Sequence, residues 1–418
     1  MSESVDYAAR AREELGFSRW WQVAAAALMM GLVSPYQYVW SSIETPLAES
    51  LGVSLPAIGL VFTVFVVIQA GSQFPVGWWR DRRGPRRLTL VAGLLAGGGY
   101  VGLAYATAVW QLYLLYALGA LGVGVVYTVA VNTAIKWFPD RRGLTTGAGT
   151  MAFAGGSALF VPYVRANATV AGYPDVLRNM GLLIGVGIVV GALVLRDPPA
   201  DWLEDADAAT TGRDDGTAPD GGTTRQFTWR ETVRTRQFWL MYAMFVAGSG
   251  AGLMLTAKIV SFADHHELGA TIATVSATLL PLASGVGRLV VGELSDRVSR
   301  ERAMAVSLAT SGTGVAAVVW LARAGNRWAF VAAVVVAVFF WSPQYALFPS
   351  LVGDYYGPRH SSANYALLYS AKIWGGVFGG VVVGVLVTLV GWDLAFAVGG
   401  AGAFAAGVGA LALSPPES

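Results

Sequence analysis

The chain has 418 residues, of which 55% are hydrophobic and only 13% carry a charge. Soluble domains carry about 25% charged residues, so this composition excludes an ordinary soluble fold and indicates a protein embedded in the lipid bilayer. The net charge of +2 is too small to suggest a nucleic-acid partner. The absence of cysteine excludes disulfides, thiolate metal sites and thiol catalysis, and with three histidines no metal centre is expected.

Apolar runs of about 20 residues, the length that crosses a bilayer as a helix, recur along the chain. The first run follows a charged tail that lacks the basic patch, short apolar run and cleavage site of a signal peptide. The pattern predicts an all-α membrane protein with twelve transmembrane helices in two six-helix bundles. The predicted spans are 20–43, 56–79, 88–108, 111–135, 143–164, 177–195, 237–261, 270–294, 303–322, 328–350, 363–388 and 391–413.

One long polar stretch divides the predicted helices into two sets of six. It is rich in Asp, Gly, Thr and Pro, a composition that cannot bury a core. At its end, Thr228-Trp-Arg-Glu231 has the spacing of a capping box, which predicts a short amphipathic helix at the membrane surface. The expected units are an N-terminal tail at 1–19, an N-terminal bundle at 20–195, a linker at 196–236 and a C-terminal bundle at 237–418.

Lysine and arginine are concentrated on one side of the predicted membrane. They fill the N-terminal tail and the loops after every second span, whereas the opposite loops contain only Arg165, Arg178, Arg323 and Arg327. Loops rich in Lys and Arg face the cytoplasm. Both termini are therefore expected to be cytoplasmic, with the protein in the plasma membrane.

The loops after the second and eighth spans repeat one motif, Gly, three residues, then Asp-Arg. A helix end packed closely at the glycine, with a carboxylate and an arginine available to neighbouring helix ends, can latch two helices in one conformation. A solvated basic turn is the alternative, but two copies in register favour the latch. Its expected residues are Gly77, Asp81, Arg82, Gly292, Asp296 and Arg297.

Three cations fall within the predicted spans, where an ionisable side chain is costly and marks a functional candidate. By helical rise, Arg288 lies about 12 Å and Lys372 about 13 Å from the cytoplasmic ends of their spans. Both are near the middle of a hydrocarbon core about 30 Å thick. No acidic residue is expected at that depth, since Glu44 falls at the outer end of the first span. Lys258 is expected to snorkel to the outer surface.

Two cations at one depth without a carboxylate indicate an anion as the missing partner. A small dicarboxylate neutralises both, because arginine offers a planar fork for a carboxylate and lysine a compact point charge. For Arg288, the alternatives to anion binding are pairing with backbone carbonyls or a side chain that extends toward the motif loop. For Lys372, the alternatives are a contact with a glycine-rich neighbouring helix or loss of its proton.

Aromatic and amide side chains are expected around the two cations. Such residues can exclude water, stand against a cation with the ring face, and donate hydrogen bonds to substrate oxygens. Ordinary helix packing is the alternative for each of them. They are Tyr127, Phe153, Trp341, Tyr345 and Tyr369, together with Gln37 and Tyr38 beside a proline in the first span.

The Gly-x-x-x-Asp-Arg repeat in two six-helix halves resembles the major facilitator superfamily. Two further segments, Lys136-Trp-Phe-Pro-Asp-Arg-Arg-Gly-Leu-Thr-Thr-Gly147 and Asn364-Tyr-Ala-Leu-Leu-Tyr-Ser-Ala-Lys372, look like the oxalate/formate antiporter family. The resemblance implies two bundles that rock around a central cavity, with both cations beside it. It also implies an aromatic cage at Gln37, Tyr38, Tyr127, Phe153, Trp341, Tyr345 and Tyr369. Phe153 lacks the hydroxyl that a tyrosine supplies, and Tyr369 stands where a tryptophan is expected.

The sequence therefore predicts a secondary active transporter of small organic anions that works by alternating access, with carboxylate exchange of the oxalate/formate type favoured. A proton-coupled monocarboxylate transporter is the alternative, and a membrane receptor or sensor that binds an anion without moving it represents another class. No Ser-His-Asp set, metal cluster or glycine-rich phosphate loop is seen, so no enzyme activity and no cofactor are expected. The protein is expected to work as a monomer.

Overall fold

The computed structural model describes residues 7–138, 142–199, 202, 226–295, 297–357 and 361–416, and these residues are helical with short connections. Helices follow the apolar runs because hydrocarbon offers no partner for a free backbone amide or carbonyl. The first half contains α1 Tyr7–Leu15, α2 Trp20–Val33, α3 Pro35–Tyr38, α4 Trp40–Leu51, α5 Leu55–Gly71, α6 Gln73–Arg83, α7 Pro85–Leu103, α8 Val109–Trp137, α9 Arg142–Gly155, η1 Gly156–Leu159, α10 Val161–Asn167 and α11 Tyr173–Val194.

The second half begins with the capping box predicted at Thr228, whose backbone N–H donates to Glu231 Oε2 at 2.9 Å. Eight helical stretches of the described chain are long and apolar enough to cross a membrane, so this is an all-helical membrane protein; the count of twelve spans stays a prediction. The elements are α13 Trp229–Thr232, α14 Arg236–His265, α15 Ala270–Leu294, α16 Arg300–Arg323, α17 Arg327–Trp341, α18 Gln344–Tyr356, α19 Ser361–Tyr369, α20 Ala371–Val377, η3 Phe378–Val382, α21 Val383–Val390 and α22 Trp392–Ala410.

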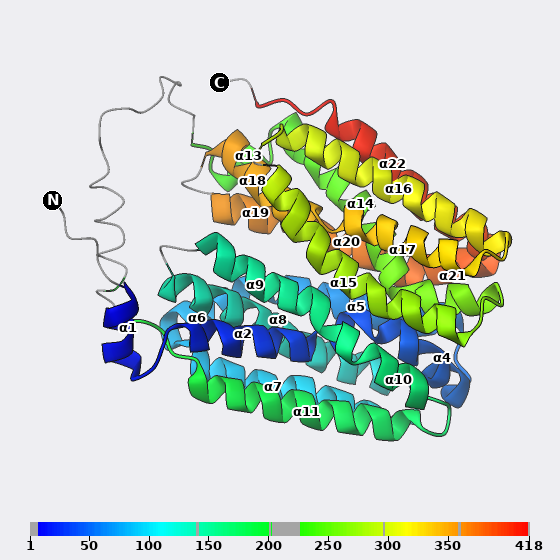
Figure 1. Ribbon diagram of the computed structural model, residues 1–418, viewed down its shortest axis with the longest axis horizontal. Helices are drawn as coiled ribbons and strands as arrows, with labels where there is room; N and C mark the ends of the chain where they lie inside the picture. The colour runs from blue at the N-terminus through cyan, green and yellow to red at the C-terminus, as the bar shows by residue number, and fades with distance from the viewer. Residues whose placement is uncertain are drawn as a thin grey trace.

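The helices form two groups that lie side by side (Figure 1). Helices α2 to α11 make the N-terminal half, and α14 to α22 make the C-terminal half. Helices α1 and α13 and the last residues of the chain lie at one end of the molecule, called here the termini end. The connections after α4, α10 and α21 lie at the opposite end.

Glycine sets the closest helix contacts inside each half. A Cβ atom at Gly97 of α7 would lie 2.7 Å from the Gly185 Cα atom of α11, and one at Gly312 of α16 would lie 2.5 Å from the Gly400 oxygen of α22. Small residues let helix backbones approach closely where lipid removes the hydrophobic drive for association. The two halves therefore use the same packing device at corresponding helix pairs.

Five of the predicted spans are divided into separate helical elements, namely 20–43, 56–79, 143–164, 328–350 and 363–388. Proline at Pro35 and Pro343 separates α2 from α3 and α17 from α18, because proline cannot donate a backbone hydrogen bond. Ser370 separates α19 from α20, and a π-helical turn, η3, follows α20. The breaks at Pro35, Pro343 and Ser370 each lie next to a predicted site residue, an arrangement typical of broken helices that line a binding cavity.

The two halves meet backbone to backbone where α5 crosses η3. A Cβ atom at Gly59 would lie 2.7 Å from the Gly380 oxygen, so neither position tolerates a side chain without movement. Thr63 adds two hydrogen bonds to this contact. Its hydroxyl donates to the Gly376 carbonyl at 3.2 Å and accepts from the Val381 N–H at 3.0 Å.

A buried ion pair joins the halves nearby, and it corrects two expectations. Lys258 does not snorkel to the surface: its side chain is 1% exposed and pairs with Glu44, which is also 1% exposed. Glu44 is therefore not at the outer end of its helix, since α4 continues to Leu51. Counting residues from one helix end gives depth, but it does not reveal a partner that arrives from a helix more than 200 residues away.

Replacing Glu44 by glutamine leaves the Lys258 charge buried and uncompensated. We expect the variant to lose about 3–5 kcal/mol of stability, the usual cost of removing one partner of a buried pair. Thermal unfolding of the purified protein in detergent, followed by tryptophan fluorescence, measures this loss. The double variant Glu44→Leu/Lys258→Met replaces the pair by apolar side chains and should recover most of it. Equal losses in the single and the double variant would contradict a compensated pair.

Candidate functional site

Lys372, near the start of α20, is 3% exposed and holds its ammonium group between the two halves of the protein. The Nζ atom donates to Gln69 Oε1 at 3.0 Å, to Gln37 Oε1 at 3.4 Å and to the Tyr369 hydroxyl at 3.4 Å. Gln37 and Gln69 belong to α3 and α5 of the N-terminal half. Every one of these partners is neutral, so the ammonium is hydrogen-bonded without being neutralised.

Arg288 of α15 reaches the same region from the other side. Its Nη2 atom lies 3.5 Å from the Tyr38 hydroxyl and 3.5 Å from Ser284 Oγ, which are long contacts. The guanidinium carbon stands 4.8 Å from the centre of the Tyr345 ring, and Lys372 Nζ stands 5.9 Å from the same centre. The two predicted cations are therefore brought together on one aromatic ring.

No carboxylate of the described residues forms an ion pair with either Arg288 or Lys372. The buried acidic group Glu44 is already paired with Lys258. Taking a charge out of water is repaid only by good partners, and here the described partners are hydroxyls, amide oxygens and ring faces. Arg288 Nε is also buried and has no hydrogen-bond partner in the part of the chain that the structure describes. The site thus brings together two basic side chains with which no described carboxylate pairs.

The predicted aromatic residues gather around these cations from both halves. In the N-terminal half, the Phe153 ring of α9 lies 5.3 Å from Tyr127 and 6.1 Å from Tyr38. In the C-terminal half, Tyr345 lies 5.7 Å from Trp341 and 6.3 Å from Tyr369. The predicted residues are therefore linked by ring contacts within each half and by Arg288 and Lys372 between the halves, and the role of each in binding stays a prediction.

Sequence reasoning missed Gln69 and Phe245. Phe245 of α14 packs edge-on against Tyr345 at 5.6 Å and against Tyr369 at 5.9 Å. Gln69 gives a signal in the sequence, since it is an amide within the otherwise apolar run of α5. Phe245 gives none, because one phenylalanine among many in an apolar helix is indistinguishable from packing.

The repeated motif is only partly described. The side chains of Asp81 and Arg82 and the whole of Asp296 lie outside the described residues. Arg297 Nη2 contacts Glu293 Oε1 at 3.3 Å, one turn back along the chain, with both side chains largely exposed. The expected tight packing at the glycines is not found: a Cβ atom at Gly77 or Gly292 would meet its nearest neighbour at 3.8 or 3.6 Å, which is ordinary contact.

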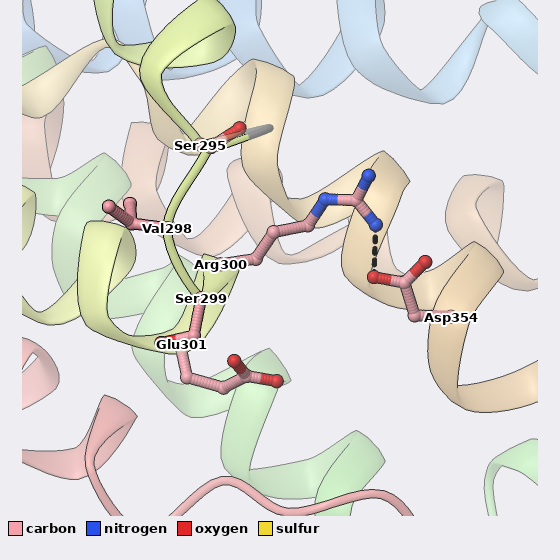
Figure 2. Close-up of a pocket in the computed structure, with 6 residues that line it drawn as sticks. All are labelled: Ser295, Val298, Ser299, Arg300, Glu301 and Asp354. Carbon is pink, nitrogen blue, oxygen red and sulfur yellow. Dashed lines mark hydrogen bonds and ion pairs between the residues drawn. The ribbon is translucent and has the colours of Figure 1, made fainter.

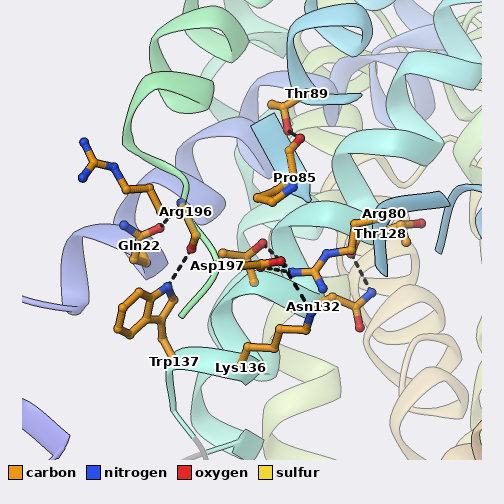
Figure 3. A network of polar contacts seen from close by, with 11 residues as sticks. Gln22, Arg80, Pro85, Thr89, Thr128, Asn132, Lys136, Trp137, Arg196 and Asp197 are labelled. Carbon is orange, nitrogen blue, oxygen red and sulfur yellow. Dashed lines mark hydrogen bonds and ion pairs between the residues drawn. The ribbon is translucent and has the colours of Figure 1, made fainter. Parts of the chain in front are cut away.

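A buried arginine next to the motif, Arg80, forms a network of polar contacts with neighbouring elements. Arg80 is fully buried and donates to Asp197 Oδ1 at 2.6 Å and to Thr133 Oγ1 at 3.0 Å (Figure 3). Lys136 Nζ lies 3.5 Å from the other Asp197 oxygen. This network ties α6 and α8 to the segment that follows α11.

The C-terminal half has a more exposed counterpart at the termini end. Arg300 at the start of α16 pairs with Asp354 of α18 (Figure 2). Glu301 accepts a hydrogen bond from the Tyr355 hydroxyl at 2.9 Å. A pocket beside this pair is lined by Ser295, Val298, Ser299, Arg300, Glu301 and Asp354.

A family model described as Major Facilitator Superfamily matches residues 20–360 and 257–418. The oxalate:formate antiporter of Oxalobacter formigenes is 33% identical over 381 residues, 91% of this chain and 88% of that protein. A probable sulfoacetate transporter, SauU, of Cupriavidus necator is 28% identical over 392 residues, 89% of this chain and 87% of that protein. The partially occluded inward open structure of the xylose transporter XylE from E. coli matches with a TM-score of 0.73 at 12% identity, covering 95% of this chain and 100% of that one. The chain belongs to the major facilitator superfamily, whose members are membrane transporters and not enzymes.

Proposed function

We propose that this protein exchanges small organic anions, with dicarboxylates such as oxalate favoured, by alternating access between two six-helix bundles. The proposal also includes twelve membrane spans, cytoplasmic termini, a location in the plasma membrane and a monomeric state. The observation that carries it is the pair of cations, Arg288 and Lys372, which face neutral partners at the interface of the two halves. A dianion is the ligand that neutralises both.

Unused hydrogen-bond donors support an anion with several oxygens. Arg288 Nε and Trp341 Nε1 are both buried and have no partner among the described residues. Leaving such a donor unsatisfied costs about 1–3 kcal/mol, and more for a charged group. A carboxylate accepts several hydrogen bonds at each oxygen, so a bound dianion would satisfy these donors and the charges together.

The relatives named above are named for small anions that carry a carboxylate. Oxalate carries two carboxylates, sulfoacetate carries one carboxylate and one sulfonate, and formate carries one carboxylate. Oxalate and sulfoacetate are small dianions with an acidic group at each end, whereas formate is a monoanion. A site with an arginine and a lysine suits such a dianion, because each cation receives one acidic group.

The geometry also suggests why the movement of the two halves depends on a bound anion. The opposite end is closed by the α5–η3 contact and by the Glu44–Lys258 pair, and we propose that this end faces outward. Lys372 links the halves through Gln37 and Gln69. A bound anion screens both cations and lets the aromatic walls close over it. Without an anion, two unneutralised charges oppose closure by desolvation, which favours exchange over one-way transport.

We further propose that the motif loops act as conformational latches at the cytoplasmic face. The proposed latch residues remain Gly77, Asp81, Arg82, Gly292, Asp296 and Arg297. The buried Arg80–Asp197 pair supports this role for the first loop, since it already joins α6 to the segment after α11.

Removing either cation should abolish dianion transport. In proteoliposomes loaded with oxalate, [14C]-oxalate uptake by Arg288→Gln or Lys372→Gln should fall at least about tenfold, since a hydrogen bond to a charged group contributes about 1.5–3 kcal/mol. Arg178→Gln is the matched control, because this exposed arginine pairs with Asp175 far from the site. Unchanged uptake in both site variants would overturn the two-cation site.

The charge of the site predicts its order of preference among anions. In competition with labelled oxalate, malonate and other short dianions should inhibit more strongly than formate, acetate or lactate, because a monoanion leaves one buried charge uncompensated. Half-inhibitory concentrations in the same vesicles measure this order. Stronger inhibition by monoanions would favour the monocarboxylate alternative. Binding of oxalate without any exchange across the vesicle membrane would favour the alternative of a membrane receptor or sensor.

A further inference from the structure

Gln69 is the closest described partner of the Lys372 ammonium. Its amide oxygen lies 3.0 Å from Lys372 Nζ, against 3.4 Å for Gln37 and for Tyr369. The side chain is fully buried, although α5 is otherwise strongly apolar around it. Burying an amide in such a helix is unfavourable unless its polar atoms are used.

The chemistry of lysine determines how the amide is oriented. An ammonium group only donates hydrogen bonds, so the amide oxygen must face Lys372 and the NH₂ group must point elsewhere. That Nε2 atom is buried and has no hydrogen-bond partner among the described residues. The amide oxygen therefore accepts a hydrogen bond from Lys372, whereas the amide NH₂ group is a donor without an acceptor among the described residues.

A neutral amide supplies geometry without supplying charge. Glutamate has almost the same shape as glutamine, and at this position its carboxylate would form an ion pair with Lys372. Arg288 would then be the remaining cation of the site without a charged partner. The presence of glutamine rather than glutamate thus decides how many negative charges the ligand must bring.

We propose that Gln69 determines the charge of the anion that this transporter accepts. This inference rests on the proposed anion-exchange function. The Gln69 oxygen holds the Lys372 ammonium in place and leaves its charge for the substrate, and the Gln69 amide N–H donates to a substrate carboxylate oxygen. Gln69 is thereby a specificity-determining residue for dianions over monoanions.

The test compares the two ligand classes in one variant. In Gln69→Glu, the dissociation constant for oxalate should rise at least about tenfold, while that for formate or acetate should stay the same or fall. Binding is measured by ligand-dependent thermal shift of purified protein, so that a carrier unable to change conformation is still informative. Gln111→Glu is the matched control, because the Gln111 oxygen caps backbone N–H groups far from the site and a carboxylate preserves that role.

The outcomes separate this inference from the function on which it rests. Equal weakening of oxalate and formate in Gln69→Glu, with normal oxalate binding by the unaltered protein, would overturn the role of Gln69 alone. An unaltered protein that binds no dicarboxylate would overturn the proposed function. Should Gln69→Glu fail to fold, Gln37→Glu places a carboxylate on the same ammonium and should shift the preference in the same direction; no shift there would also overturn the inference.

Discussion

The cost of holding positive charge away from water governs the centre of this protein. The chain buries cations in two different ways. Lys258 is neutralised by Glu44 across the two halves, whereas Lys372 receives only amide oxygens and a hydroxyl from the described residues. The first charge is neutralised within the protein, whereas no described carboxylate pairs with the second. We propose that this difference separates a structural contact from a binding site within one membrane protein.

The interruptions of the helices explain how the site is built. Regular helices turn their polar backbone atoms inward and present only side chains to a cavity. Breaks in the helices lie beside Tyr38, Trp341 and Tyr369, whose rings belong to the candidate site. Proline lies at the first two breaks and Ser370 at the third, a π-helical turn follows α20, and tight glycine contacts bring the surrounding helices together. The helices of the candidate site are therefore interrupted beside several of its aromatic residues.

Much of this arrangement could be predicted from the sequence, because each prediction depended on a local property. Apolar length gave the helices, and depth within a run placed Arg288 and Lys372 together. The predictions that failed concerned residues whose partners are distant along the chain. The Glu44–Lys258 pair joins α4 to α14, and no residue count within either helix reveals it. Gln69 was missed for the same reason, since its role appears only when Lys372 lies beside it.

The contact between α5 and η3 has a consequence for the rate at which the two halves can separate. At Gly59 and Gly380 the two halves touch through main-chain atoms. Interlocked side chains must change rotamer before two surfaces can part, and each change adds a barrier. Smooth backbone surfaces need no such rearrangement. We propose that the main-chain part of this contact separates without rotamer changes, once the hydrogen bonds of Thr63 to Gly376 and Val381 are broken.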